Sequence, residues 1–163
     1  MTSDAVTILR DGQERFFADP PDYQGASAMF TRVTQLRPDW IEGHHWLAAS
    51  HEALDQISDA EDAYRTAAKC DVEDPRPQVS LGRLLLSAGR FREAIRELER
   101  GVKLKHHYAE ADSRLFLAEA YEAAGERSKA RAEWHTISKM EGFYPSYDEP
   151  MKEARRKLAQ TKP

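Results

Sequence analysis

The sequence predicts an all-α protein that is built from repeated helical hairpins. Hydrophobic residues make up 40% of its 163 residues and charged residues 32%, as expected for amphipathic helices with charged outer faces. The stretch from Leu81 to Leu98, "LGRLLLSAGRFREAIREL", contains two apolar stripes at helical spacing, which Gly89 separates. Because glycine commonly follows the last turn of a helix, this stretch is predicted to form a helix, a short turn and a second helix.

The same hairpin recurs along the chain. Small residues near the start of each second helix are separated by 34, 34 and 36 residues: Ala26, Ala60, Ala94 and Ala130. Four residues after each alanine stands a bulky side chain, in chain order Phe30, Tyr64, Leu98 and Trp134. Three first helices also carry a leucine followed by a small residue: Leu47–Ala48, Leu81–Gly82 and Leu117–Ala118. The longer last interval predicts a two-residue insertion in the turn near His106 to Glu110.

This pattern resembles the tetratricopeptide repeat (TPR), a helix–turn–helix unit of 34 residues. The stretch "LAEAYEAAGERSKARAEW" at residues 117–134 carries the leucine-small, tyrosine, glycine, alanine and aromatic positions of the family together. The resemblance implies a right-handed α-solenoid, which we expect as a single domain over residues 1–163. The expected repeats lie at about residues 7–40, 41–74, 75–108 and 111–144, and the expected capping helix at about 149–160.

The two ends of the chain depart from the repeat pattern. The first copy has Gln13 and Glu14 in place of the leucine-small pair and only Phe17 at its aromatic position, as is common for a terminal repeat. In the capping helix, Asp148 is expected to be the N-cap and Pro150 to lie in the first turn. An apolar stripe is predicted to pack on the last repeat: Met151, Ala154 and Leu158.

Two segments near the C-terminus allow more than one interpretation. The basic residues of the capping helix form either a solvated outer face or a docking patch for an acidic partner: Lys152, Arg155, Arg156 and Lys157. The aromatic residues of "EGFYPSYDEP", at residues 141–150, either seat the capping helix or form a recognition loop: Phe143, Tyr144 and Tyr147.

The resemblance also implies a concave groove that is lined by the first helix of each pair. Helical spacing then selects the candidate partner-binding residues: Glu42, His45, Trp46, Ala49, Arg76, Val79, Ser80, Arg83, Leu115, Phe116 and Glu119. We expect a non-catalytic adaptor that binds a peptide or protein segment there, since tryptophan and arginine often anchor interfaces. The alternative is that Trp46, Leu115 and Phe116 only pack between repeats. The lysine, asparagine and arginine clamp by which some family members bind chaperone tails is not present.

Two further hypotheses compete with the adaptor. One is a self-associating module, in which the groove or an end helix packs against a second copy to give a homo-oligomer. The other is a ligand or metal binder that uses the histidine-rich second copy, with His44, His45 and His51. No metal-binding spacing such as H-E-x-x-H occurs, and no catalytic or cofactor-binding motif is found, so we expect no metal, no cofactor and no enzyme activity. Cys70 is expected to be a structural thiol.

Charge and hydropathy limit the classes of partner and the location. The net charge is −4, which gives no general attraction to nucleic acid or to an anionic membrane. The longest aliphatic run is Leu84 to Leu86, and the N-terminus does not resemble a signal peptide. We therefore expect a cytoplasmic protein that contacts neither nucleic acid nor membrane.

Overall fold

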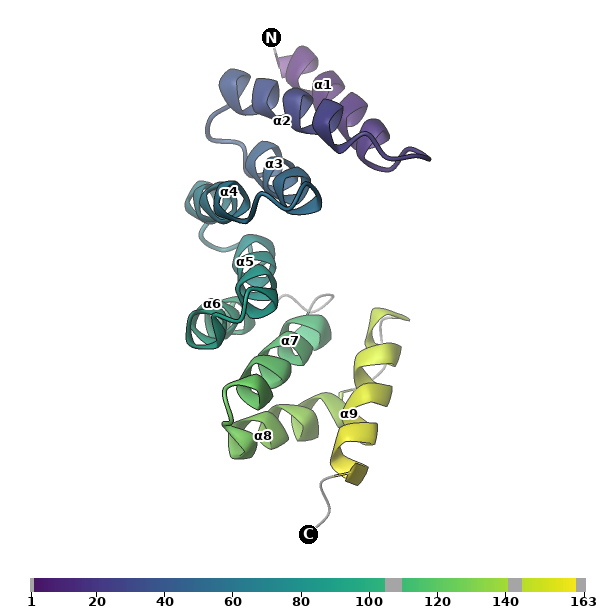
Figure 1. Ribbon diagram of the computed structural model, residues 1–163, viewed down its shortest axis with the longest axis vertical. Coiled ribbons are helices and arrows are strands. Elements are labelled where there is room, and N and C mark those ends of the chain that lie inside the picture. The colour runs from purple at the N-terminus through teal and green to yellow at the C-terminus, as the bar shows by residue number, and fades with distance from the viewer. Residues whose placement is uncertain (1, 105–109, 141–144, 161–163) are drawn as a thin grey trace. The chain divides into compact units, whose positions relative to one another are not determined.

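The computed structural model describes residues 2–104, 110–140 and 145–160, and the regular structure in these ranges is helical (Figure 1). The helices are α1 (Thr2–Phe16), α2 (Tyr23–Leu36), α3 (Ile41–Ala53), α4 (Ile57–Cys70), α5 (Arg76–Ser87), α6 (Phe91–Lys103), α7 (Glu110–Ala123), α8 (Arg127–Ser138) and α9 (Asp148–Gln160). A 3-10 turn, η1 (Pro145–Tyr147), precedes α9.

The all-α prediction is confirmed. Helix α1 begins before residue 7, where the first repeat was expected to start. The predicted insertion near His106 falls largely on residues outside the described ranges.

The chain divides into two compact units, Met1–Val72 and Glu73–Pro163. In the first unit, α1 packs on α2, α2 on α3 and α3 on α4, and α1 also touches α3. In the second unit, α5 and α6 form one hairpin and α7 and α8 another, while α6 packs on α7 and α9 on α8. Each unit is thus a series of hairpins in which neighbours in sequence are neighbours in space. The single domain over residues 1–163 stays a prediction.

Equivalent positions of the four copies are equally buried. The small residue of each second helix is at most 2% exposed: Ala26, Ala60, Ala94 and Ala130. The bulky residue four positions later is also at most 2% exposed: Phe30, Tyr64, Leu98 and Trp134. Full burial of such side chains is worth about 1.5–3 kcal/mol each, so these positions hold each hairpin together.

Close approach of α5 and α6 explains why a small residue follows the leucine of the first helix. A Cβ atom placed on Gly82 would lie 2.4 Å from Cγ of Leu98 and 3.3 Å from the carbonyl oxygen of Ala94. The first distance is far below van der Waals contact, so any side chain at residue 82 would push the two helices apart. Ala48 and Ala118, the equivalent small residues of α3 and α7, are fully buried.

A left-handed residue ends the first helix of three hairpins. Asp55, Gly89 and Gly125 have φ angles of 59°, 74° and 79°. In each turn the next N–H donates to a carbonyl oxygen five residues earlier, at 2.8–2.9 Å: Gln56 to His51, Arg90 to Leu85, and Glu126 to Tyr121. This is the Schellman geometry that satisfies the last carbonyl groups of a helix.

Helix α9 packs on α8 and α7 through a small apolar face. Ala154 is fully buried, and Tyr147 of η1 is 6% exposed, while η1 contacts both α7 and α9. Tyr147 therefore helps to seat α9, whereas Phe143 and Tyr144 lie outside the described residues. Asp148 is the first residue of the helix rather than its N-cap.

The expectation that all four basic residues of α9 face solvent is wrong for Lys157. Its Nζ lies 2.5 Å from a carboxylate oxygen of Glu122 and 5.7 Å from the centre of the Trp134 ring. Lys157 follows the buried Ala154 by three residues and so lies on the packed side of α9. Its long stem carries the ammonium group across to α7 and α8.

Candidate functional site

Four of the predicted groove residues lie on α3, in the first unit. Glu42, His45, Trp46 and Ala49 are all partly buried. The His45 ring packs edge-on against Tyr64 of α4, with 5.4 Å between ring centres. Trp46 packs with the core residues of α1 and α2, among them Phe30, at a centre-to-centre distance of 5.9 Å. Trp46 therefore packs in the first unit, as the alternative interpretation expects, and its role in a groove stays a prediction.

Trp46 also belongs to a cluster of rings at the end of α1. Phe16 and Phe17 each contact Trp46 edge-on with 5.5 Å between ring centres, and Phe16 also contacts Tyr23 at 5.0 Å. Phe17 is 70% exposed, although its repeat position is an aromatic core position in the family. Helix α1 ends at Phe16, so Phe17 lies beyond the helix and only Phe16 turns inward. We call Phe16, Phe17 and Trp46 the aromatic face.

The predicted groove residues on α5 have different partners within the second unit. The Arg76 guanidinium donates to both carboxylate oxygens of Asp74, from Nε to Oδ1 at 3.1 Å and from Nη2 to Oδ2 at 2.6 Å, so its charge is neutralised locally. Val79 packs against α6, because a Cβ atom on Gly101 would lie 2.7 Å from its side chain. Ser80 and Arg83 are partly buried.

The predicted groove residues on α7 are Leu115, Phe116 and Glu119, and all three are partly buried. Burial is the largest cause that raises the pKa of the Glu119 carboxyl; Lys157 opposes the rise, and the nearby Glu153 adds to it. Burial also raises the pKa of Asp112. Helix α7 therefore carries carboxylates whose negative charge is poorly solvated, and a cation would favour their ionised form.

The structure thus divides the predicted residues between its two units. The four on α3 belong to the first unit, and the seven on α5 and α7 belong to the second, where these two helices are in contact. A groove that uses all of them stays a prediction.

Two hydrogen bonds between paired helices were missed by the sequence analysis. The Trp134 indole N–H donates to Glu122 at 3.0 Å, and the Tyr64 hydroxyl donates to Glu52 at 3.1 Å. The two pairs occupy the same repeat positions in the fourth and second copies. In the third copy these positions hold Leu98 and Leu86, an apolar pair. Comparing both positions between copies would have revealed this exchange.

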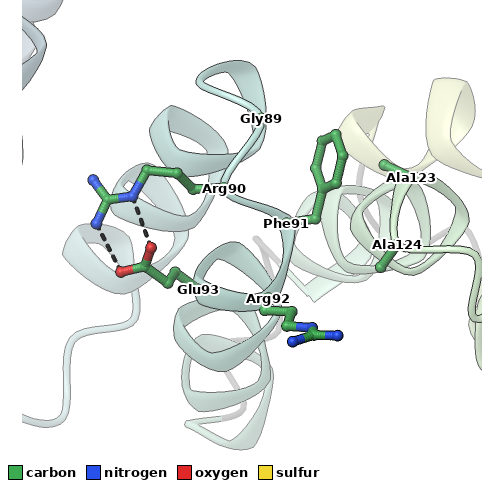
Figure 2. A pocket seen from close by; sticks show the side chains of 7 residues that line it. All are labelled: Gly89, Arg90, Phe91, Arg92, Glu93, Ala123 and Ala124. Atoms are coloured by element: carbon green, nitrogen blue, oxygen red, sulfur yellow. Dashed lines mark hydrogen bonds and ion pairs between the residues drawn. The ribbon is translucent and has the colours of Figure 1, made fainter.

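A shallow pocket of about 360 Å³ lies in the second unit, between the α5–α6 turn and the end of α7. Its lining residues are Gly89, Arg90, Phe91, Arg92, Glu93, Ala123 and Ala124. Figure 2 shows the Phe91 ring facing Ala123 and Ala124, whereas Arg90 and Glu93 pair on the other side of the helix start. The pocket thus joins an apolar wall with the charged side chains of Arg90, Arg92 and Glu93.

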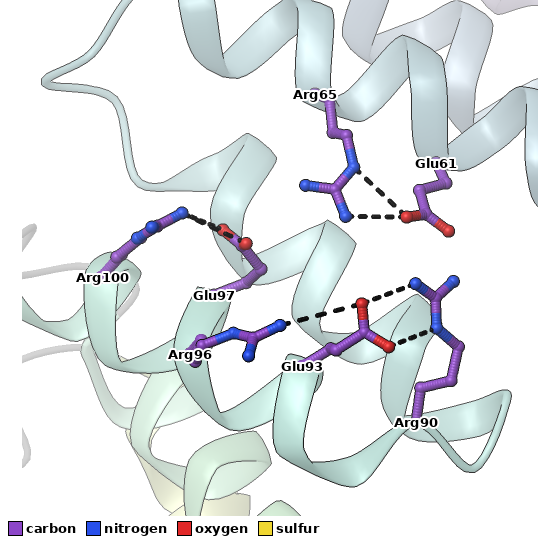
Figure 3. Close-up of polar contacts among 7 residues, drawn as sticks. All are labelled: Glu61, Arg65, Arg90, Glu93, Arg96, Glu97 and Arg100. Atoms are coloured by element: carbon purple, nitrogen blue, oxygen red, sulfur yellow. Dashed lines mark hydrogen bonds and ion pairs between the residues drawn. The ribbon is translucent and has the colours of Figure 1, made fainter.

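Ion pairs at the start of α6 and along it join residues three positions apart in the chain. Arg90 and Arg96 both approach Glu93, at 2.7 and 3.8 Å, and Arg100 approaches Glu97 at 3.1 Å (Figure 3). The Glu97 residue is only 8% exposed, so this carboxylate is not part of a fully solvated face. In the first unit, Arg65 of α4 pairs with Glu61 at 2.7 Å.

The histidines and the cysteine form local contacts. The Nε2 atom of His44 lies 2.9 Å from the carbonyl oxygen of Pro38, and the Nδ1 atom of His51 lies 2.6 Å from the side-chain oxygen of Gln56. His106 and His107 lie outside the described residues. Within the ranges that the structure describes, no three histidine, cysteine, aspartate or glutamate side chains are grouped to hold a metal ion.

The Cys70 thiol is weakly engaged and not activated. Its Sγ lies 3.8 Å from the Pro38 carbonyl oxygen, and burial, assisted by Asp39, raises the pKa of the thiol. A raised pKa favours the protonated thiol, the less nucleophilic form of the group. Among the described helices, none has the length and apolar character that crossing a membrane requires.

Comparisons with known proteins identify the fold. No protein-family model matches the chain, and no curated protein matches it. Solved structures do match. PilF of Pseudomonas aeruginosa superimposes with a TM-score of 0.80 at 15% identity, over 98% of this chain and 71% of that one. TTC0263, a TPR protein of Thermus thermophilus, gives 0.72 at 20% identity, over 96% and 84% of the two chains.

A third match is YrrB, described as a TPR protein with an unusual peptide-binding site. Its TM-score is 0.71 at 12% identity, over 99% of this chain and 81% of that one. Identities this low carry the fold and no more. The repeat positions in the sequence, their equivalent burial and these matches agree. The chain has the tetratricopeptide-repeat fold.

Proposed function

We propose that this protein is a non-catalytic adaptor that binds a peptide or protein segment through the first helices of its pairs. The observation that carries the proposal is the aromatic face, where Phe17 is 70% exposed and touches the partly buried Trp46. The first helices of a pair line the concave side in the family that the sequence resembles, and α1 and α3 are such helices.

Exposed rings on a rigid support are suited to binding. Aromatic side chains dominate the energetics of many interfaces because they bury a large area with little loss of conformational freedom. Covering the exposed part of Phe17 would contribute about 1–2 kcal/mol, which corresponds to about a tenfold gain in affinity. The description of YrrB as a peptide-binding TPR protein supports this kind of ligand for the fold.

Charges in the second unit suggest the chemistry of a ligand for its own helices. The poorly solvated carboxyl groups of Glu119 and Asp112 on α7 would gain from a partner's lysine or arginine. We therefore propose apolar anchors in a ligand of the aromatic face and, separately, basic residues in a ligand of the second unit, where Arg83, Leu115 and Phe116 are among the contacts.

The test is selection of peptides from a random display library on the purified full chain, followed by fluorescence anisotropy with the selected peptides. F17S should weaken binding about tenfold, because it removes the most exposed ring of the aromatic face. Its melting temperature should stay unchanged, since so exposed a ring contributes little to the core.

V72S is the matched control, because Val72 is 68% exposed and lies outside the aromatic face in the same unit. It should leave the affinity within about twofold. Equal binding of F17S and the wild type, or an equal loss in V72S, would show that the aromatic face is not the binding surface.

A further inference from the structure

A second pocket, of about 460 Å³, lies between α8 and α9 in the second unit. Its lining residues are Arg131, His135 and Ser138 of α8 and Arg155, Leu158 and Ala159 of α9. Its volume is within the range of small-molecule and side-chain pockets. Arginine side chains from two helices line one pocket here, together with apolar residues of α9.

The two arginines of this pocket differ from the other basic residues of α9 in their ion pairing. Three of the four basic residues of α9 form ion pairs within their own unit: Lys152, Arg156 and Lys157. Arg155 and Arg131 are exposed, and over the described residues neither guanidinium forms an ion pair. The pocket is therefore a local positive site on a chain of net charge −4.

We propose that this pocket binds an acidic segment of a partner protein, with a glutamate or aspartate side chain beside an apolar one. A planar guanidinium binds a carboxylate through two parallel hydrogen bonds, and arginines on both walls can hold one or two such groups. Leu158 and Ala159 provide contact for the neighbouring apolar side chain. The site uses other residues than the aromatic face does. Its partner segment is acidic, whereas the ligand proposed for the α7 carboxylates is basic.

The test measures binding of a fluorescein-labelled, capped peptide, Glu-Leu-Glu-Glu-Leu-Glu, to the full chain by anisotropy at low and at physiological salt. R131Q and R155Q should each weaken binding about three- to tenfold. Binding should fall as salt is raised, because the contributing charges are exposed. Both variants should melt at the wild-type temperature.

R156Q is the matched control, since it removes the same charge from the same helix at an exposed position outside the pocket. It should leave the affinity within about twofold.

A peptide with glutamine in place of each glutamate should not bind. The proposal is overturned if the acidic peptide does not bind, if the glutamine peptide binds equally, or if R156Q weakens binding as much as R155Q does. None of these results depends on F17S, so the two binding surfaces are tested separately.

Discussion

Among single residues, Asp55 carries the clearest backbone strain. It has a φ of 59° at the turn position that glycine occupies in the two following hairpins, Gly89 and Gly125. Side chains other than glycine adopt this left-handed conformation at a cost, although aspartate and asparagine tolerate it better than most. Asp55 precedes Gly89 by 34 residues, which is one repeat length, so the two residues occupy equivalent positions. The repeat spacing therefore indicates this turn from the sequence.

We expect D55G to stabilise the protein by about 0.5–1 kcal/mol, because relief of the left-handed strain exceeds the added chain entropy of glycine. G89A is the reciprocal change and should destabilise by about 1–2 kcal/mol. A Cβ atom on Gly89 meets nothing within 4 Å, so its cost is that of the backbone alone. Urea unfolding measures both free energies. A destabilising D55G would show that the aspartate side chain contributes more than the strain costs.

Within a hairpin, one position on each helix forms a facing pair, and two kinds of residue pair occur there. The second and fourth hairpins use an aromatic hydrogen-bond donor on the second helix and a glutamate on the first, whereas the third hairpin uses Leu98 and Leu86. A buried donor needs an acceptor, and a buried leucine does not. The two positions therefore change together from copy to copy.

E122A should lower the free energy of unfolding by about 1–3 kcal/mol, because it leaves the indole N–H of the buried Trp134 without its acceptor. E122Q retains an acceptor and loses only the ion pair with Lys157, so it should cost about 1 kcal/mol or less. Urea unfolding followed by tryptophan fluorescence measures both. Equal losses in E122A and E122Q would assign the whole effect to the Lys157 ion pair.

For the whole molecule, the oligomeric state in solution distinguishes the adaptor from the self-associating module. An adaptor that keeps its binding surface free is expected to be a monomer of 18.6 kDa. Multi-angle light scattering at several concentrations measures the mass directly. A stable dimer or larger assembly would favour the self-associating module, and F17S would then show whether the aromatic face is its interface.

The candidate site was less predictable than the fold. Helical spacing selected Trp46 as a groove residue, and the structure packs it against the core of the first unit and beside Phe17. The spacing of α5 selected Arg76 and Val79, but Asp74 neutralises the first and the second packs at Gly101. Helical spacing gives the side of a helix, whereas exposure and charge pairing depend on neighbours from other helices.

The order of the hairpins follows from the sequence by itself, because the periods that produce it are local. Apolar stripes, the recurring alanines and the glycine after α5 act within about 34 residues of chain. Only the tertiary structure decided which charges remain available for a partner. Lys157 pairs with Glu122, 35 residues away, and Arg155, two positions before it, enters the α8–α9 pocket. Such partners are selected by the packing of one helix on another, and helical spacing within either helix does not specify that contact.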